Sequence, residues 1–401
     1  MTRRSLTAKG WRNLALLMTA GLVGAVLSSS TPVTAATPTS GTPQAAASLI
    51  PSTGSYLPPI RHVFVINLEN KGYDETWGAG SKAPYLSGPL RAKGVLLSQY
   101  YGTAHNSLPN YIAQISGQGP NQQTQGDCQI YTPFSPATPA PQGQYVGSGC
   151  VYPAPVATLP GQLQRHGLSW KGYMDDMGTP CRHPALGSRD DTQQAEVGDQ
   201  YAARHDPFVY FSAITDSPGC ARHVVGLSRL TSDLSAASTT PNLSYITPNL
   251  CNDGHDTPCV DGRPGGLVSA DAWLKKWVPR IRSSPAFQQD GLLIITFDES
   301  DGPQSDSSAC CGEGPGPNAA MPGITGLGGG RVGALLLSRY IAPNTFSSTP
   351  YNHYSLLASI EDIFGLGRLG YAGSAGLNRF GLDVYNRYGS WVTHAHCQNV
   401  V

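Results

Sequence analysis

Two apolar runs far apart in the chain each end in a short polar cluster, and this arrangement restricts the fold more than any other feature. The first run, HVFVINL at residues 62–68, leads into Glu69-Asn70. The second, GLLIITF at residues 291–297, leads into Asp298-Glu299. Their length and β-branched content predict buried strands. Open α/β sheets form ligand sites at the carboxyl ends of their strands. If the two strands are neighbours, the clusters should therefore meet.

The two clusters together predict a site for a hard cation. Carboxylate and amide oxygens are the ligands that such cations prefer in proteins. Oxygen ligands suit Ca, Mg, Mn or Fe, and Zn stays open, so the identity of the divalent metal ion is not specified. Ordinary strand-to-loop turns are the alternative for each cluster taken alone, because Asp and Asn are common in turns.

A third segment, HNSLPNY at residues 105–111, supplies a candidate nucleophile. Ser107 stands just before Pro109 and an apolar-spaced stretch, a pattern typical of a helix start. A hydroxyl at that position lies near free backbone N–H groups and the positive end of the helix dipole, which favours phosphate binding. Ser107 could equally be a plain N-cap residue, and Thr103 and Asn106 are rivals for the same roles.

Together with further segments, these pieces resemble the bacterial phosphoesterase family of acid phosphatases and phospholipases C. Within that family the chain is most similar to secreted acid phosphatases acting on phosphatidylinositol 3-phosphate. The other matching segments are APYL (83–86), YAARHDPFVYF (201–211), PNLCNDGHD (248–256) and YNHYSLLASIEDIFGL (351–366). The resemblance implies an α/β fold like that of alkaline phosphatase. Such a fold has a central, mostly parallel sheet flanked by helices, with loop insertions.

The resemblance also implies a role for each matched residue. The metal ligands would be Glu69, Asn70, Asp298 and Glu299. The nucleophile would be Ser107, assisted by His105, His205 and His255. The substrate-binding residues would be Asn106, Asn110 and Asp253.

The histidines have structural interpretations as well. His205 could stabilise a helix C-terminus through the dipole. His255 could be a solvated loop side chain, and His105 could orient the loop next to Ser107 or be exposed. His353 could cap the helix expected at residues 354–365.

The function predicted from these residues is a secreted, metal-dependent hydrolase of phosphate monoesters that works through a hydroxyl nucleophile and a phosphoenzyme. Its substrate would be a phosphorylated small molecule or a phospholipid headgroup, such as that of phosphatidylinositol 3-phosphate. Two alternatives remain. One is a phosphodiesterase of the phospholipase C type, and the other is a non-catalytic surface-binding protein on the same scaffold.

The start of the chain predicts export. Four basic residues precede an apolar run at 14–27 and small residues, so residues 1–36 resemble a signal peptide for the Sec or twin-arginine pathway. Residues 37–58, rich in Ala, Thr, Pro and Ser, read as a disordered linker, which leaves 59–401 as a single catalytic domain. We expect a secreted or cell-wall-associated protein whose mature form has no stable membrane span.

Nine cysteines in an exported protein predict disulfides. The local pairs expected are Cys128–Cys150, Cys181–Cys220 and Cys251–Cys259, and Cys397 is expected to pair with Cys310 or Cys311. Lys plus Arg equals Asp plus Glu, at 26 each, and no basic run occurs. This balance argues against a nucleic-acid partner.

The remaining patterns give approximate elements. Helices are predicted near 84–92, 158–166, 222–235, 268–282 and 354–365. Strands are predicted near 60–68, 94–98, 169–174, 242–247, 291–297 and 331–337. Residues 117–160 and 302–330 read as insertions that form walls of the substrate pocket.

Overall fold

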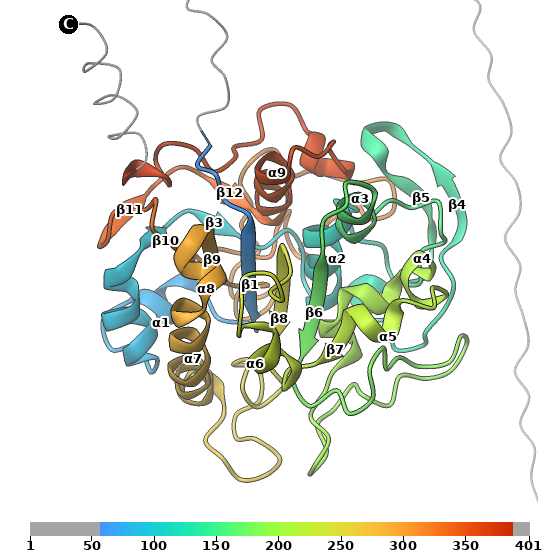
Figure 1. The fold of residues 1–401 in the computed structure, drawn as a ribbon. Helices are drawn as coiled ribbons and strands as arrows, with labels where there is room; N and C mark the ends of the chain where they lie inside the picture. Colours follow the sequence, from blue (N-terminus) through green and yellow to red (C-terminus); the bar gives the residue numbers. More distant parts are fainter. Residues whose placement is uncertain (1–56, 388–401) are drawn as a thin grey trace, which may run out of the picture. The chain divides into compact units, whose positions relative to one another are not determined.

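The two apolar runs become β1 (His62–Leu68) and β9 (Gly291–Phe297), fully buried neighbours in the main sheet. The computed structural model describes residues 57–387, and its main sheet has the order β11-β2-β10-β9-β1-β8-β6-β7 (Figure 1). The other strands of this sheet are β11 (Thr345–Ser347), β2 (Val95–Leu97), β10 (Ala334–Ser338), β8 (Leu243–Thr247), β6 (Trp170–Met174) and β7 (Val224–Gly226). Pairing is parallel except on the two sides of β10, which is antiparallel to β9 and β2. The predicted mostly parallel α/β sheet is thus confirmed.

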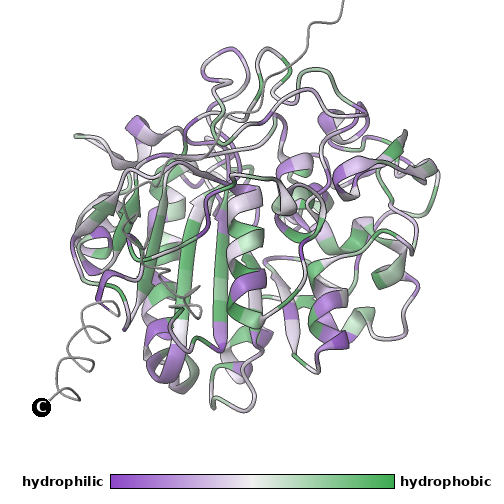
Figure 2. Cartoon of the chain, turned by 90° about the horizontal axis from the view of Figure 1, so that it is seen from above, coloured by the Kyte–Doolittle hydropathy of each residue, from purple (hydrophilic) through white to green (hydrophobic). Residues whose placement is uncertain are grey.

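Helices flank this sheet (Figure 1). They are α1 (Tyr73–Trp77), α2 (Ser107–Ser116), α3 (Leu159–Arg165), α4 (Ser212–Thr215), α5 (Cys220–His223), α6 (Arg229–Asp233), α7 (Gly266–Ser283), α8 (Pro285–Asp290) and α9 (His353–Phe364). Helices α2, α3 and α9 pack against one another, while α8 contacts α7 and the central strands β1 and β9. Figure 2 shows the central strands as mostly hydrophobic, as their burial requires.

Two small sheets lie outside the main one. Strands β3 (Tyr100–Tyr101) and β12 (Tyr351–Asn352) pair in parallel and bring the start of α9 beside the segment that precedes α2. Strands β4 (Ser135–Pro139) and β5 (Tyr145–Ser148) form an antiparallel hairpin within the first predicted insertion.

Two of the predicted helices are wrong in part. The helix expected at 222–235 is interrupted, because Val224–Gly226 forms β7 and pairs with β6 between α5 and α6. β-Branched valines beside an open sheet edge favour this pairing. The helix expected at 84–92 is a π-helical turn, Leu86–Leu90, followed by a 3₁₀ turn, Arg91–Lys93. Pro89 lies inside it and lacks the N–H that a regular helix needs.

Three of the predicted disulfides are confirmed: Cys128–Cys150, Cys181–Cys220 and Cys251–Cys259. The pairing of Cys397 with Cys310 or Cys311 is wrong, since those two adjacent cysteines bond to each other. Cys397, the predicted signal peptide and the linker up to residue 56 lie outside the described residues. Within residues 57–387 no helix has both the length and the apolar content to cross a membrane.

Candidate active site

The register of β1 and β9 brings the two predicted clusters together. Leu68 pairs with Phe297, so Glu69 and Asp298 leave adjacent parallel strands at the same level. The Asp298 N–H donates to the Leu68 carbonyl at 2.9 Å, which continues the ladder by one more bond. Both carboxylates are completely buried. Neighbouring strand ends therefore place two buried acidic side chains side by side, as the sequence predicted.

Asn70 adds a third polar group to this pair. Its backbone N–H donates to Asp298 Oδ1 at 3.1 Å. One heavy atom of its side-chain amide lies 2.8 Å from Glu69 Oε2 and 3.3 Å from Asp298 Oδ1. As a nitrogen, that atom would donate to both carboxylates. As an oxygen, it forms with them a close group of three oxygens, which a cation would satisfy.

Ser107 joins the same group from the start of α2. The residue is 2 % exposed, and its hydroxyl donates to Glu69 Oε2 at 2.7 Å. The N-cap residue of α2 is Asn106, and the Leu108 N–H is accepted instead by Asp127 Oδ1 at 3.0 Å. The Ser107 hydroxyl is thus directed at the carboxylates and does not cap its helix. This geometry favours the nucleophile over the plain N-cap interpretation.

His205 and Tyr111 complete the surroundings of Glu69. The Tyr111 hydroxyl donates to Glu69 Oε1, and His205 Nε2 lies 3.2 Å from Glu69 Oε2. The rings of Tyr111 and His205 are stacked, with centroids 5.4 Å apart. On its other side, His205 Nδ1 lies 3.4 Å from Asp253 Oδ2. His205 therefore lies between two buried carboxylates, at the last position of the 3₁₀ turn Ala203–His205.

Burial shifts the protonation of these carboxylic acids. It raises the pKa of Glu69 well above its usual range, and the charges of Asp298 and Asp253 raise it further against the hydrogen bonds from Tyr111 and Ser107. Burial also raises the pKa of Asp298 and that of Asp253 to about 7. Three buried acids in one pocket resist being ionised together. A cation bound among them would favour all three carboxylate forms.

Several buried polar atoms of this group make no hydrogen bond, although His205 lies within ion-pair distance of Glu69 and Asp253. Among residues 57–387, Asp298 Oδ2, Asp253 Oδ2 and both ring nitrogens of His205 make no hydrogen bond. Unpaired buried polar atoms are rare in folded proteins, and they often mark a site for an ion or water. The donor set of carboxylates, amide, hydroxyl and imidazole suits a divalent metal ion. The residues present thus fit the metal site predicted from the sequence.

Glu299 takes a different direction from its neighbour Asp298. It is 1 % exposed and is paired with His105 Nδ1, while His105 Nε2 contacts the Asp306 carbonyl at 3.0 Å. The structure thus pairs Glu299 with His105, which belongs to the segment that leads into α2. The role of Glu299 as a metal ligand and the role of His105 in catalysis stay predictions.

His353 also contacts the site, through the backbone of Asp298. It is the first residue of α9, yet Asn352 caps this helix by accepting from the Ser355 N–H at 2.8 Å. The buried His353 ring contacts the Asp298 carbonyl through Nε2 at 2.5 Å and the Tyr100 hydroxyl through Nδ1 at 3.1 Å. It therefore positions the backbone of Asp298 and is not the helix cap.

The asparagines predicted to bind substrate differ in their surroundings. Asn110 uses its amide on the segment before α2, accepting from the N–H groups of Thr103 and Ala104 at 2.8 and 2.9 Å. It also donates to the carbonyls of Ala104 and Asn106 at 2.8 and 2.9 Å. Asn110 thus fixes this loop. Asn106 donates to the Gln125 carbonyl at 2.7 Å.

His255 lies at the rim of the pocket. Its side chain is 36 % exposed and its ring Nδ1 contacts Asp256 Oδ1 at 2.8 Å. Its backbone N–H donates to Asp253 Oδ1 at 2.7 Å, so the loop between Cys251 and Cys259 positions both site residues. Burial lowers the pKa of His255, but the hydrogen bond to Asp256 and the charge of Asp253 outweigh it, so its pKa is raised.

Two residues of this group were given no role from the sequence: Tyr111 and Asp127. Tyr111 follows Ser107 by four residues, and a helix places such positions on one face. That spacing was the available signal for Tyr111. Asp127 reaches the start of α2 from a separate loop by accepting from the Leu108 N–H, and the local pattern gives no signal for such a contact.

The fold and the site define a class: an α/β protein whose buried hydroxyl and carboxylates meet at the carboxyl edge of a mostly parallel sheet. The Phosphoesterase family matches residues 81–367, and the chain belongs to this family.

Individual relatives are more distant. An acid phosphatase of Aspergillus fumigatus is 26 % identical over 310 residues, covering 77 % of this chain and 55 % of that protein. A phosphate-repressible acid phosphatase of Penicillium chrysogenum is 27 % identical over 281 residues, covering 70 % and 54 %. This chain therefore spans about half the length of these fungal relatives. A phosphatidylinositol-3-phosphatase of Mycobacterium tuberculosis is 25 % identical over 329 residues, covering 81 % and 85 %.

Solved structures are similar at lower identity. A protein in the alkaline phosphatase superfamily from Vibrio parahaemolyticus has a TM-score of 0.44 and 12 % identity, covering 78 % of this chain and 67 % of that one.

Proposed function

We propose that this protein hydrolyses phosphate monoesters with Ser107 as nucleophile and a divalent metal ion held by Glu69, Asn70 and Asp298, which Glu299 would join by leaving His105. The observation that carries the proposal is the hydrogen bond of the Ser107 hydroxyl to Glu69, inside a group of buried carboxylates with unpaired atoms. The acid phosphatases and the phosphatidylinositol-3-phosphatase among its relatives support the same reaction class.

The residues divide the reaction between them. Ser107 attacks the phosphorus atom while its hydroxyl proton passes to the Glu69 carboxylate that accepts its hydrogen bond, and the P–O bond to the leaving group breaks. Bound metal would supply positive charge that lowers the pKa of the hydroxyl and offsets the charge of the phosphate. The start of α2 presents its positive dipole end to the same phosphate.

His205 and His255 differ in the direction in which their pKa values are shifted, and therefore in their suitability as proton donors. Burial, with the charges of Arg204 and His255, lowers the pKa of His205 well below its usual range, which disfavours this ring as a proton donor. The raised pKa of His255 at the rim suits a proton donor for the leaving alkoxide. A water molecule then attacks the phosphoserine and releases inorganic phosphate.

The substrate proposed is a phosphorylated small molecule or a phospholipid headgroup, with phosphatidylinositol 3-phosphate as the lipid case. A phosphodiesterase of the phospholipase C type is the second candidate, since the family resemblance covers both reactions. Secretion or attachment to the cell wall belongs to the same proposal and rests on the residues before position 57.

The test compares a monoester with a diester. The full chain, freed of metal and reloaded with each divalent ion in turn, is assayed on p-nitrophenyl phosphate and on p-nitrophenyl phosphorylcholine. We expect the monoester to be cleaved faster by at least about tenfold and Ser107→Ala to lose about 10³-fold or more in kcat.

Ser116→Ala is the matched control for the nucleophile. Ser116 lies at the other end of α2, is also buried, and donates to the Ile112 carbonyl of its own helix. This variant should keep wild-type kcat. Full activity in Ser107→Ala would contradict the assignment and point to Thr103, while faster cleavage of the diester would favour the phospholipase C reaction.

A further inference from the structure

Arg204 is a buried cation beside the candidate site. It is 4 % exposed and lies in the 3₁₀ turn Ala203–His205, directly before the histidine that contacts Glu69. Removing a guanidinium from water is costly unless its N–H groups find acceptors. The contacts of Arg204 therefore indicate what its side chain is positioned to bind.

The guanidinium of Arg204 is incompletely paired within the described chain. Its Nη1 donates to the Gln193 carbonyl at 2.9 Å, and its Nε lies 3.9 Å from Asp127 Oδ2, beyond hydrogen-bonding distance. Arg182 is a useful comparison, because its two terminal nitrogens donate to Asp199 at 2.8 and 2.7 Å. A carboxylate thus binds both terminal nitrogens of Arg182, whereas within residues 57–387 the carboxylate nearest to Arg204, that of Asp127, makes no hydrogen bond to it.

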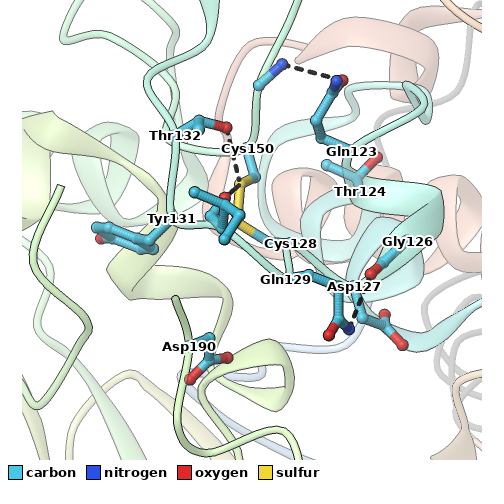
Figure 3. The surroundings of a disulfide bond; sticks show 12 residues. Gln123, Thr124, Gly126, Asp127, Cys128, Gln129, Tyr131, Thr132, Cys150 and Asp190 are labelled. Atoms are coloured by element: carbon cyan, nitrogen blue, oxygen red, sulfur yellow. Dashed lines mark hydrogen bonds between the residues drawn. A yellow bond between two sulfur atoms is a disulfide. The ribbon is translucent and has the colours of Figure 1, made fainter. Parts of the chain in front are cut away.

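Asp127 fixes the place of Arg204 relative to the nucleophile. One oxygen of this carboxylate accepts from the Leu108 N–H, the peptide that follows Ser107, and the other faces Arg204. The guanidinium and the start of α2 are therefore on two sides of one carboxylate. Figure 3 shows Asp127 next to the Cys128–Cys150 disulfide, which links two parts of the first insertion.

We propose that Arg204 donates hydrogen bonds to the nonbridging oxygens of the substrate phosphate and so favours a monoester dianion over a diester monoanion. The planar fork of arginine matches the spacing of phosphate oxygens. A monoester offers three such oxygens and two charges, whereas a diester offers two oxygens and one charge. This inference rests on the proposed phosphatase reaction and adds the residue that selects its substrate class.

The test uses the full, metal-loaded chain with Arg204→Gln and Arg204→Lys, and Arg182→Gln as the control of matched chemistry. The first readout is the Kd of inorganic phosphate by titration calorimetry, which needs no turnover. The second is the ratio of kcat/KM for p-nitrophenyl phosphate to that for bis(p-nitrophenyl) phosphate. Thermal unfolding establishes that each variant is folded.

We expect Arg204→Gln to weaken phosphate binding by about 10- to 100-fold, as for the loss of a charged hydrogen bond, and to lower the ratio by about tenfold. Arg204→Lys should lose about 3- to 10-fold, because an ammonium group cannot bind two oxygens with a planar fork. Arg182→Gln should stay within about twofold of wild type.

Wild-type phosphate affinity in a folded Arg204→Gln variant would overturn the inference, as would an equal loss in Arg182→Gln. Where Arg204→Gln does not fold, unchanged affinity in Arg204→Lys overturns it. If the wild type binds phosphate but cleaves neither ester, the proposed function fails while the calorimetry still decides the role of Arg204.

Discussion

At the residue scale, the partner of each buried side chain is more informative than its type. Ser107 and Ser116 are both buried serines of α2, yet one hydroxyl faces Glu69 and the other its own helix. The sequence indicated Ser107 through the helix-start pattern around Pro109. It could not separate nucleophile from cap, because that distinction depends on a carboxylate 38 residues away.

We predict that the Tyr111 hydroxyl positions the Glu69 carboxylate for metal binding. Its hydroxyl donates to Glu69, while its ring stacks on His205. Tyr111→Phe keeps the ring and removes the donor, so Glu69 should hold the metal ion less firmly. We expect metal affinity, measured by titration, to fall about 10-fold or more, as for other residues that orient a metal ligand.

Tyr131→Phe is the control for this change, since the Tyr131 hydroxyl donates to the Val209 carbonyl. That variant should keep wild-type metal affinity. Unchanged metal affinity in Tyr111→Phe would show that the hydroxyl does not orient the ligand.

The raised pKa of Glu361, a residue outside the candidate site, predicts that the free energy of unfolding depends on pH. Burial raises the pKa of this α9 residue to about 7 despite the charge of Arg368. The native state thus binds an extra proton above the ordinary pKa of 4.5, and the free energy of unfolding falls as the pH rises from about 4.5 to 7. Glu361→Gln should remove this part of the slope, on the order of 3 kcal/mol.

Urea unfolding at pH 5 and pH 8 measures this effect, with Glu196→Gln as the exposed control. The wild type should lose stability relative to Glu361→Gln between the two pH values. A constant difference between the two proteins would contradict the raised pKa.

At the element scale, the sequence predicted the buried strands best. Long β-branched runs such as 62–68 and 291–297 have no competing interpretation once they end in turns. Two short elements were not predicted. Strand β7 depends on the open edge of β6, and the π-helical turn at Leu86–Leu90 depends on one proline. Tertiary context decides such cases over local propensity.

The ends of α2 and α9 give a matched pair of predictions. Gly117 and Gly365 are their left-handed C-cap residues, with φ of 67° and 66°. A Cβ on Gly117 would lie 2.2 Å from the Leu369 carbonyl oxygen, whereas one on Gly365 meets nothing within 4 Å. Gly365→Ala should cost about 1 kcal/mol of left-handed strain.

Gly117→Ala should cost clearly more, about 3 kcal/mol or above, since backbone must also move. Chemical denaturation of both variants gives the comparison. Equal losses of unfolding free energy in the two variants would contradict this prediction, because the close contact with Leu369 would then add no cost.

At the scale of the whole molecule, the two central strands and both insertions meet near the start of α2. Gln125 of the first insertion donates to the carbonyls of Met321 and Pro322 in the second, and His105 N–H donates to Pro322 at 3.3 Å. Both insertions therefore lie beside the site, as their positions in the sequence suggested. Their individual contacts had no signal in the local pattern.

Metal binding should stabilise the whole domain. A ligand that binds only the native state at about 100 times its Kd adds about 2.7 kcal/mol to the free energy of unfolding. We expect divalent ions to raise the Tm of the wild type and chelator to reverse the rise. Glu69→Gln and Asp298→Asn should respond far less, and an equal rise in these variants would place the metal elsewhere.

The central claim is that Ser107 attacks phosphate at the Glu69–Asp298 pocket. Its most direct test is to quench the metal-loaded enzyme in acid during turnover of p-nitrophenyl phosphate and to map the phosphorylated peptide by mass spectrometry. The structure predicts one phosphoryl group on Ser107, absent from Ser107→Ala and present in Ser116→Ala. Phosphate on Thr103, or turnover without any phosphorylated residue, would contradict the account.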